Sequence, residues 1–158
     1  AGFSGDSDKE LEDLESAKAN IQINLLNPIL IINEILKKII KDGRSFLVIV
    51  TSVAGLRGRG KNLIYGSAKS GLITYASGLR QKFNKNLKVV TVIPGYIKTK
   101  NFNVIAPSFL ICTPAQLAIK IFKAIKHNKE IIYSSFIWKI IMFVLKFIPE
   151  KIFKKLKF

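Results

Sequence analysis

Two short apolar runs restrict the fold of this chain more than any other feature of its sequence. They are "SFLVIVTS" at residues 45–52 and "LKVVTVI" at residues 87–93. Both are rich in β-branched residues and too short for a helix of ordinary length, which is typical of strands buried on both faces. Residues 63–83, between them, have a helical pattern. A strand–helix–strand order predicts parallel pairing, with the helix packed on the sheet.

The flanking segments extend this pattern. Residues 9–41 begin with acidic residues and end in "KKIIKDG", which predicts a helical stretch that ends at Gly43 and is kinked or split by Pro28. Thr113 as the N-cap and Pro114 at the first helical position open another helix, and "EIIYS" after it predicts a third short strand. The sequence therefore predicts an α/β fold, a doubly wound parallel sheet with helices on its faces.

Composition excludes several classes of site. Cys112 is the only cysteine, so no disulfide can form within the chain, which fits a reducing, cytoplasmic compartment. His127 is the only histidine and lies at a basic helix end, where a capping or solvated role is expected. These counts exclude most zinc sites and a Ser-His-Asp triad within this chain, and we expect no metal site.

The formal net charge of +16 calls for an anionic partner or reflects a lysine-rich background composition. The lysines are interleaved with Ile, Leu and Phe, and no nucleic-acid-binding motif is present. The basic excess is greatest beside the apolar C-terminal segment. This pattern favours an anionic membrane surface over nucleic acid.

Three residues with complementary proton chemistry occur in "TSVAGLRGRGKNLIYGSAK". Ser52 ends the first strand, and Tyr65 and Lys69 lie one turn apart on the following helix. Ligands of open α/β sheets bind beyond the carboxyl ends of the strands, where Ser52 lies. An ammonium about 4 Å from a phenol would lower its pKa by about 3 units at an effective dielectric of 20. Tyr65 could then act as a general acid or base near neutrality.

The Tyr-x-x-x-Lys pair alone is equally consistent with an ordinary surface tyrosine beside a lysine. Together with the serine, however, the Ser-x12-Tyr-x-x-x-Lys pattern resembles the active site of short-chain dehydrogenases/reductases. "YGSAKSGLITYASGLRQKF" is similar to the active-site helix of that family, "VVTVIPGYIKT" to its next strand and Pro-Gly turn, and "INLLNPI" to its asparagine motif. The resemblance covers about residues 1–130.

The resemblance implies a role for each matching residue. Tyr65 would be the general acid/base, Ser52 would orient the substrate oxygen, Lys69 would lower the tyrosine pKa and hold the nicotinamide ribose, and Asn24 would anchor a water in a proton relay. The expected nicotinamide-side residues are Pro94, Gly95, Ile97 and Thr99, together with Tyr65 and Lys69. The implied cofactor is NAD or NADP, without a readable preference.

One part of the family pattern is absent from the sequence. A Gly-rich turn after a first strand does not occur, and "AGFSG" at the start reads as the end of the family's Asn-Ala-Gly stretch. We therefore expect the chain to be the C-terminal part of the fold, with the N-terminal half missing and no dinucleotide binding by this chain alone. "GLRGRG" (55–60) is a weak substitute phosphate loop, because it lies in the serine-to-tyrosine interval.

The C-terminal segment has a different character. Residues 136–148 are apolar but contain Lys139 and Lys146, and Pro149 separates them from "EKIFKKLKF". The run is too short for a normal membrane span, and two basic amphipathic helices are typical of a membrane interface. The alternative is a helix packed over the substrate pocket or in an oligomer interface. The tail resembles in character the family branch that includes decaprenylphosphoryl-2-ketoribose reductases.

We therefore expect residues 1–133 to belong to a Rossmann-like catalytic domain and residues 134–158 to form an amphipathic tail. The predicted function is NAD(P)-dependent interconversion of an alcohol and a ketone, on a small-molecule or lipid-linked substrate, in a cytoplasmic homo-oligomer at the inner face of the membrane. The alternative from a different class is an inactive, membrane-associated interaction module.

Overall fold

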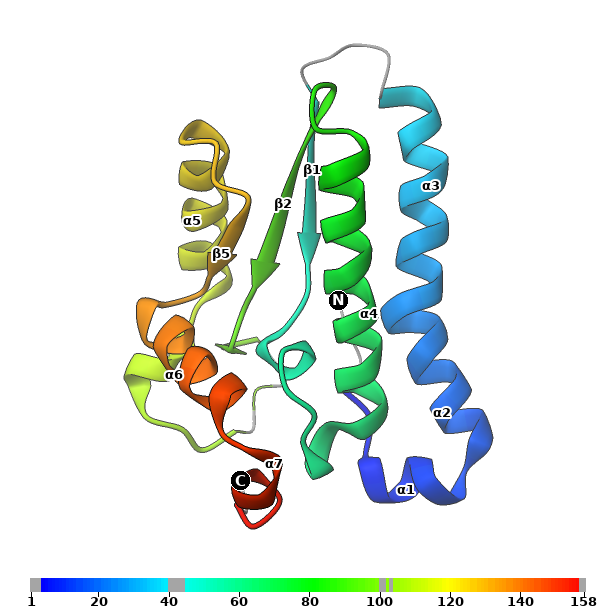
Figure 1. Cartoon of the computed structure of the whole chain (residues 1–158), viewed down its shortest axis with the longest axis vertical. Coiled ribbons are helices and arrows are strands. Elements are labelled where there is room, and N and C mark those ends of the chain that lie inside the picture. The colour runs from blue at the N-terminus through cyan, green and yellow to red at the C-terminus, as the bar shows by residue number, and fades with distance from the viewer. Residues whose placement is uncertain (1–3, 40–44, 100–101, 103, 157–158) are drawn as a thin grey trace.

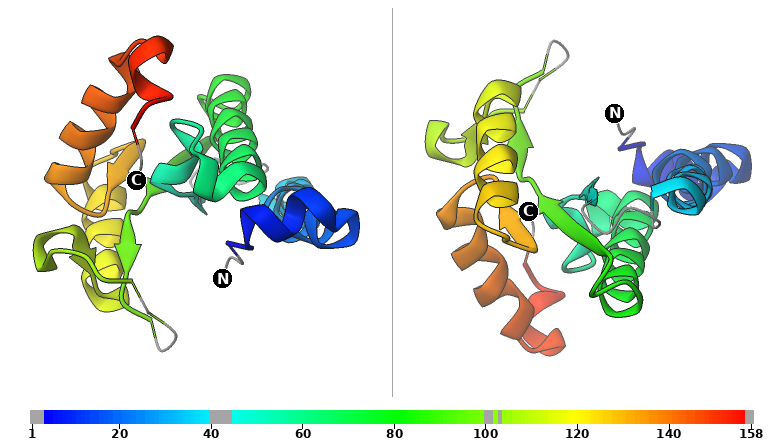
Figure 2. Two further views of the ribbon diagram at one scale, coloured as in Figure 1. Left: turned by 90° about the horizontal axis from the view of Figure 1, so that it is seen from below. Right: turned by 90° about the horizontal axis from the view of Figure 1, so that it is seen from above.

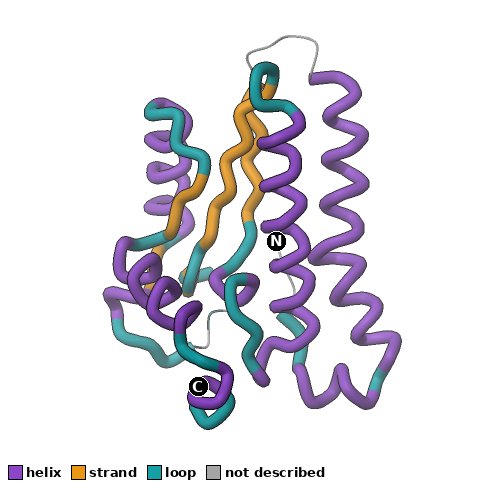
Figure 3. Tube along the Cα trace, in the orientation of Figure 1, coloured by secondary structure: helices purple, strands orange, loops and turns teal. Residues whose placement is uncertain are grey.

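The structure, a computed structural model that describes residues 4–39, 45–99, 102 and 104–156, is built around a three-stranded parallel sheet of order β1-β2-β5 (Figures 1 and 3). The strands are β1 (Ser45–Val50), β2 (Leu87–Ile93) and β5 (Ile131–Tyr133). All three predicted strands are confirmed, and each bound lies within two residues of the prediction.

Helices cover both faces of this sheet (Figure 2). On one face, α3 (Asn27–Ile39) and α4 (Leu63–Lys82) pack on the strands, and α5 (Pro114–Lys126) packs on the other face. The first core consists of Ile32, Leu36, Leu47, Ile49, Leu72, Ala76, Leu79, Leu87 and Val89. The second consists of Val90, Val92, Cys112, Leu117, Ala124 and Ile132. Neighbouring residues of β2 thus enter different cores, which explains why its buried positions are apolar except for Thr91, whereas Lys88 is exposed.

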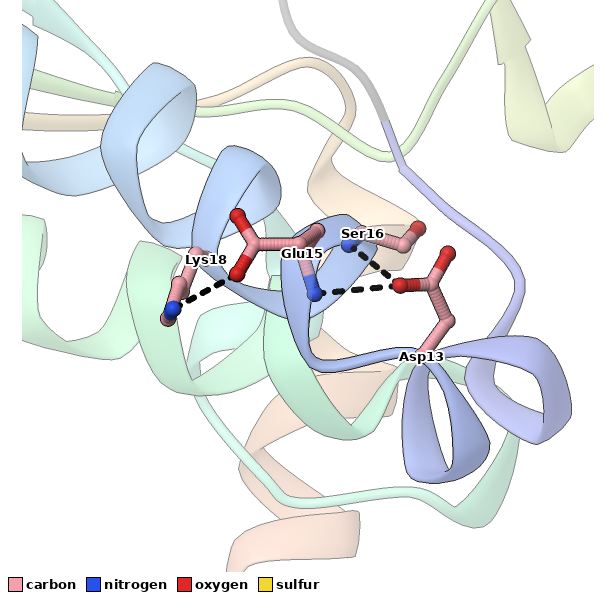
Figure 4. A network of polar contacts seen from close by, with 4 residues as sticks. All are labelled: Asp13, Glu15, Ser16 and Lys18. Carbon is pink, nitrogen blue, oxygen red and sulfur yellow. Dashed lines mark hydrogen bonds and ion pairs between the residues drawn. The ribbon is translucent and has the colours of Figure 1, made fainter.

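The N-terminal helical run breaks at a place that the sequence analysis missed. It consists of α1 (Ser7–Glu12), α2 (Leu14–Ile21), a π-helical turn (Gln22–Leu26) and α3. The break is at Asp13, whose Oδ1 accepts hydrogen bonds from the backbone N–H groups of Glu15 at 3.0 Å and Ser16 at 3.3 Å (Figure 4). Asp13 thereby caps α2.

Pro28 does not split the run into two helices, because it is the second residue of α3. Proline has no N–H to donate to the carbonyl four residues earlier, and the π-helical turn directly precedes it. The helical run therefore continues through the proline, with a local change from α-helical to π-helical hydrogen bonding. The predicted terminus at Gly43 lies outside the described residues.

The predicted start of α5 is confirmed in detail. The Thr113 hydroxyl accepts from the Gln116 N–H at 3.2 Å, and the Gln116 side chain accepts from the Thr113 N–H at 2.9 Å, which completes a capping box. A short parallel pair, β3 (Tyr96–Ile97) with β4 (Ile111–Cys112), was not predicted. It holds the segment that follows β2 beside α5.

The C-terminal segment forms α6 (Phe136–Phe147) and α7 (Glu150–Phe153), with Pro149 between them as predicted. Trp138 and Met142 of α6 are buried against Val53 and Ile93. Figure 1 shows α6 beside the carboxyl end of the sheet. One face of α6 therefore packs on protein. Within the described ranges, no helix combines the length and hydropathy needed to cross a bilayer.

Candidate active site

Ser52 lies directly after β1, where the chain turns away from the sheet. The Thr51 N–H and hydroxyl both donate to the Val92 carbonyl at 2.8 Å, which ties this end of β1 to β2. Ser52 is 9% exposed, and its Oγ accepts from the Ala54 N–H at 3.1 Å, which caps a 3-10 turn. The backbone therefore fixes the position of the Ser52 hydroxyl before any ligand is considered.

The turn after Ser52 lies very close to α4. A Cβ on Gly55 would come within 2.6 Å of the Lys69 carbonyl carbon, and a Cβ on Gly66 would lie 3.0 Å from the Ala54 carbonyl oxygen. Only glycine permits this approach of two backbones. The two glycines therefore set the spacing between Ser52 and the helix that carries Tyr65 and Lys69.

The structure brings Ser52, Tyr65 and Lys69 together at the carboxyl end of the sheet. Tyr65 is in the first turn of α4, partly buried, and its hydroxyl interacts with the Ser52 side chain. Lys69 is 7% exposed, and its Nζ lies 5.6 Å from the centre of the Tyr65 ring. The predicted i and i+4 placement on one helix face is confirmed.

The electrostatics differ from the expectation. Burial raises the pKa of Tyr65 above its ordinary value of 10.0, and the hydrogen bond with Ser52 only partly offsets this rise. Burial also lowers the pKa of Lys69 from its ordinary value. The expected fall of the tyrosine pKa toward neutrality is therefore wrong for this structure, because desolvation of the phenol outweighs the hydrogen bond with Ser52.

Asn24 lies in the π-helical turn and is fully buried. Its Nδ2 donates to Asn20 Oδ1 at 2.7 Å, and Asn20 Nδ2 donates to Glu10 Oε1 at 2.6 Å. A buried carboxylate of α1 thus fixes the amide of Asn24 through one intermediate side chain. Glu10 and Asn20 were not singled out from the sequence, because only the tertiary fold places α1 beside this turn.

The expected nicotinamide-side residues divide into two groups. Gly95 and Ile97 line the same cavity as Ser52 and Tyr65. Pro94 is buried, and its carbonyl accepts from the Val53 N–H at 3.0 Å, so it joins the two strand ends. Thr99 is exposed and does not line this cavity.

The cavity has a volume of about 540 Å³ and lies at the carboxyl ends of the strands. Besides the residues already named, its lining includes several that the sequence analysis did not single out: Arg59, Lys61, Asn62, Tyr96, Phe102, Val104 and Trp138. Arg59 and Lys61 stand in the serine-to-tyrosine interval, so their position in the motif was an available signal. Trp138 belongs to the tail and carried no such signal.

Trp138 connects α6 to the site. Its indole packs on Gly95, where an added Cβ would come within 2.0 Å of the ring, and its Nε1 donates to the Leu110 carbonyl at 2.9 Å. The Tyr96 ring meets it edge-on, with centroids 5.4 Å apart. The tail therefore forms one wall of the cavity, as its alternative interpretation expected.

Arg57 makes a second connection between the loop after Ser52 and the tail. Its Nη2 donates to the Ile148 carbonyl at 3.2 Å and to Glu150 Oε2 at 2.7 Å, and its guanidinium lies 4.3 Å from the centre of the Phe153 ring. The conformation of this loop is thus coupled to α7.

Ser52, Tyr65 and Lys69 together provide two hydroxyls and one ammonium. This set can hold a carbonyl or alcohol oxygen and exchange a proton with it. Among the described residues, no group of three or more His, Cys, Asp or Glu side chains could hold a metal ion. The hydroxyls of Ser52 and Tyr65 and the ammonium of Lys69 fit proton exchange at a carbon–oxygen bond.

The sequence comparisons show the family of this chain. The profile of the family described as short chain dehydrogenase matches residues 1–108. The chain is also 25% identical over 156 residues to an uncharacterised oxidoreductase of Mycobacterium tuberculosis. This match covers 98% of this chain and 63% of the relative. It is 32% identical over 100 residues to a 3-oxoacyl-[acyl-carrier-protein] reductase of Bos taurus, covering 63% of this chain and 42% of the relative.

The fold agrees as well. A short chain dehydrogenase of Burkholderia cenocepacia, solved in complex with NADP, superposes with a TM-score of 0.79 at 17% identity, over 92% of this chain and 63% of that chain. The chain belongs to the short-chain dehydrogenase family, and its parallel sheet is Rossmann-like. It spans less than two thirds of the length of these relatives.

Proposed function

We propose that this chain carries the catalytic residues of an NAD(P)-dependent oxidoreductase that interconverts an alcohol and a ketone. The observation that carries the proposal is the convergence of Ser52 and Tyr65 on one cavity, with Lys69 packed against the Tyr65 ring. The reductase names of its relatives support a ketone as the substrate.

Each residue has a distinct part in this reaction. The Ser52 hydroxyl donates a hydrogen bond to the substrate oxygen and fixes its position. The Tyr65 hydroxyl gives its proton to that oxygen during reduction and takes it back during oxidation. We propose that Asn24, whose amide donates to Asn20, anchors a water in the proton relay.

The site has residues suited to hold a nicotinamide cofactor. Tyr65, Gly95 and Ile97 line the cavity, and Lys69 lies beside it with a nearly buried ammonium. We propose that Lys69 and Tyr65 hold the ribose. Pro94 and Thr99, in the segment after β2, lie on the nicotinamide side in this proposal. The bound nicotinamide supplies or accepts the hydride. The preference between NAD and NADP is left to the assay.

The cavity also favours a hydrophobic substrate. Apolar and aromatic side chains form much of its lining: Val53, Ile97, Phe102, Val104 and Trp138. A lipid-linked or otherwise hydrophobic alcohol or ketone can bury its apolar part against these side chains.

We further propose that the tail binds the anionic surface of a membrane from the cytoplasmic side. Outside its buried face, α6 exposes Phe136, Phe143 and Phe147 at 65–71%, and the lysines of α6 and α7 are exposed beside them. A groove of about 650 Å³ is lined almost entirely by apolar side chains: Phe143, Val144, Phe147, Ile148, Pro149, Ile152 and Leu156. Apolar side chains flanked by lysines are typical of an interfacial helix.

Self-association is a further part of the proposal. The helical run from the π turn through α3 exposes Ile23, Leu26, Leu30, Ile31 and Ile35, each more than 40% accessible. Most follow helical spacing, so they form an apolar stripe. A second copy of the protein is the occupant that we propose for this face, which makes the protein a homo-oligomer.

The test is an assay of the complete gene product with NADH and NADPH on a panel of ketones of increasing chain length. We expect ketone-dependent oxidation of one dinucleotide, fastest with a hydrophobic ketone. The complete gene product could instead bind neither dinucleotide and show no turnover in either direction. That result would contradict the proposal and favour the inactive, membrane-associated module.

A further inference from the structure

The loop between Ser52 and Tyr65 places two cations in the catalytic cavity. Arg59 and Lys61 line it, and no carboxylate is among its lining residues. Neither cation takes part in an ion pair with a described residue, since those pairs are Lys18–Glu15, Lys37–Glu34 and Arg57–Glu150. The described part of the cavity therefore has a positive charge, from Arg59 and Lys61, that no described carboxylate neutralises.

Arg59 differs from an ordinary surface arginine. Arg59 as a whole is partly buried. Its Nε atom is fully buried and has no hydrogen-bond partner among the described residues. A buried guanidinium donor without an acceptor has a substantial desolvation cost. An acceptor brought by a ligand would remove this cost.

Asn62 orients this arginine. In the orientation that satisfies both of its polar atoms, the Asn62 amide oxygen accepts from Arg59 Nη2 at 3.2 Å, and its nitrogen donates to the Lys61 carbonyl at 3.1 Å. Arg57, two residues earlier, is committed to α7 instead. The two arginines of this loop therefore have separate partners, and Arg59 is the one that lines the cavity.

We propose that Arg59 and Lys61 form a subsite for an anionic group of the substrate, a carboxylate or a phosphate, attached to an apolar body. The apolar body contacts the wall that includes Phe102, Val104 and Trp138. A guanidinium and an ammonium that line one cavity suit an oxyanion, because both donate charge-assisted hydrogen bonds. This subsite rests on the proposed function, since it defines the substrate class of that same cavity.

The test compares three ketones with one apolar body, bearing a carboxylate, a phosphate monoester or a neutral methyl ester. With the wild-type complete gene product we expect kcat/KM to favour an anionic ketone over the ester. Arg59→Met should reduce this preference about 10- to 100-fold, as expected for the loss of a charge-assisted hydrogen bond. Lys61→Met should reduce it less, and Arg59→Lys should restore part of it.

Lys85→Met is the matched control, because Lys85 is exposed in the turn after α4, at the other end of the strands. It removes one positive charge from the protein without touching the cavity and should keep the preference. The relative rates of the carboxylate and the phosphate ketones identify which anion the subsite accepts.

Three results would overturn the subsite. One is equal kcat/KM for anionic and neutral ketones in the wild type, which leaves the proposed function standing. Another is a preference for anionic ketones that falls as much in Lys85→Met as in Arg59→Met. That result would show that the preference comes from the net charge of the protein. The third is an Arg59→Met variant with weaker NADPH binding and an unchanged preference for the anionic ketone. That result would show that Arg59 binds the cofactor and not the substrate. Failure to reduce any ketone counts against the proposed function itself, and the subsite falls with it.

Discussion

At the scale of single residues, the sequence pattern identified the groups but not their electrostatics. The spacing of Ser52, Tyr65 and Lys69 correctly predicted that they meet, because strand ends and helix periodicity fix their directions. The direction of the Tyr65 pKa shift could not be predicted from spacing, because it depends on how deeply the phenol and the ammonium are buried. Arg59 was likewise visible in the motif, but the burial of its Nε without a hydrogen-bond partner among the described residues was not.

The raised pKa of Tyr65 predicts the pH dependence of reduction. In the proposed reaction, reduction requires a protonated Tyr65. Because the pKa of Tyr65 is raised above its ordinary value of 10.0, the phenol stays protonated at neutral pH. We therefore expect kcat/KM for ketone reduction to show no tyrosine ionisation from about pH 6 to about pH 9, and to fall only at higher pH. A pH–rate profile measures this.

Lys69→Met provides the comparison for that profile. An apparent pKa near neutrality in the wild type that moves upward in Lys69→Met would contradict the expected profile. It would show that the ammonium, rather than burial, controls Tyr65 in the working enzyme.

At the scale of elements, the order of strands and helices was predictable, and the contacts between distant elements were not. The mostly apolar sequence of β2 correctly indicated burial on both faces. The cap at Asp13 was overlooked, although an aspartate before a helical turn was a readable local signal. The position of Trp138 on Gly95 depends on a packing arrangement across more than forty residues of sequence and leaves no local pattern.

The close approach of the serine loop to α4 gives a prediction about Gly55. Gly55→Ala places a Cβ 2.6 Å from the Lys69 carbonyl carbon, so the loop that carries Ser52 must shift. We expect a loss of about 1–3 kcal/mol in the free energy of unfolding, together with a marked fall in kcat. Denaturant unfolding and steady-state kinetics measure the two effects.

Gly78→Ala on α4 is the matched control, because nothing lies within 4 Å of a Cβ at that position. Alanine in a helix interior should raise the free energy of unfolding by up to about 1 kcal/mol and leave kcat unchanged. If Gly55→Ala behaved like Gly78→Ala, the close contact between the loop and α4 would not be needed for the site.

At the scale of the whole molecule, charge and exposed apolar surface occur together. The net charge is +16, and the tail combines exposed aromatic side chains with exposed lysines. The sequence predicted an amphipathic tail, and the structure adds that its other face forms a wall of the cavity through Trp138. A helix that contacts both the cavity and the solvent can bring a hydrophobic substrate close to the site.

Membrane binding by this surface should have an apolar and an electrostatic part. We expect the complete gene product to co-sediment with anionic vesicles, less with neutral ones, and to be partly released by salt, because each lysine near the surface contributes about 1 kcal/mol. Replacing the exposed Phe143 and Phe147 with serine should weaken binding to both vesicles, and Lys85→Met should change it little. Absence of vesicle binding would assign the exposed face of α6 to a protein contact.

The central claim is that Tyr65 transfers the proton, and a pair of tyrosine variants on α4 tests it. Tyr75 lies on the same helix, where its hydroxyl donates to Asn33 Oδ1 at 2.5 Å and does not line the cavity. In the complete gene product, Tyr65→Phe should lower kcat at least about 100-fold, with an unchanged thermal melting profile, whereas Tyr75→Phe should keep a kcat close to that of the wild type. A Tyr65→Phe variant with near-normal kcat would contradict the claim.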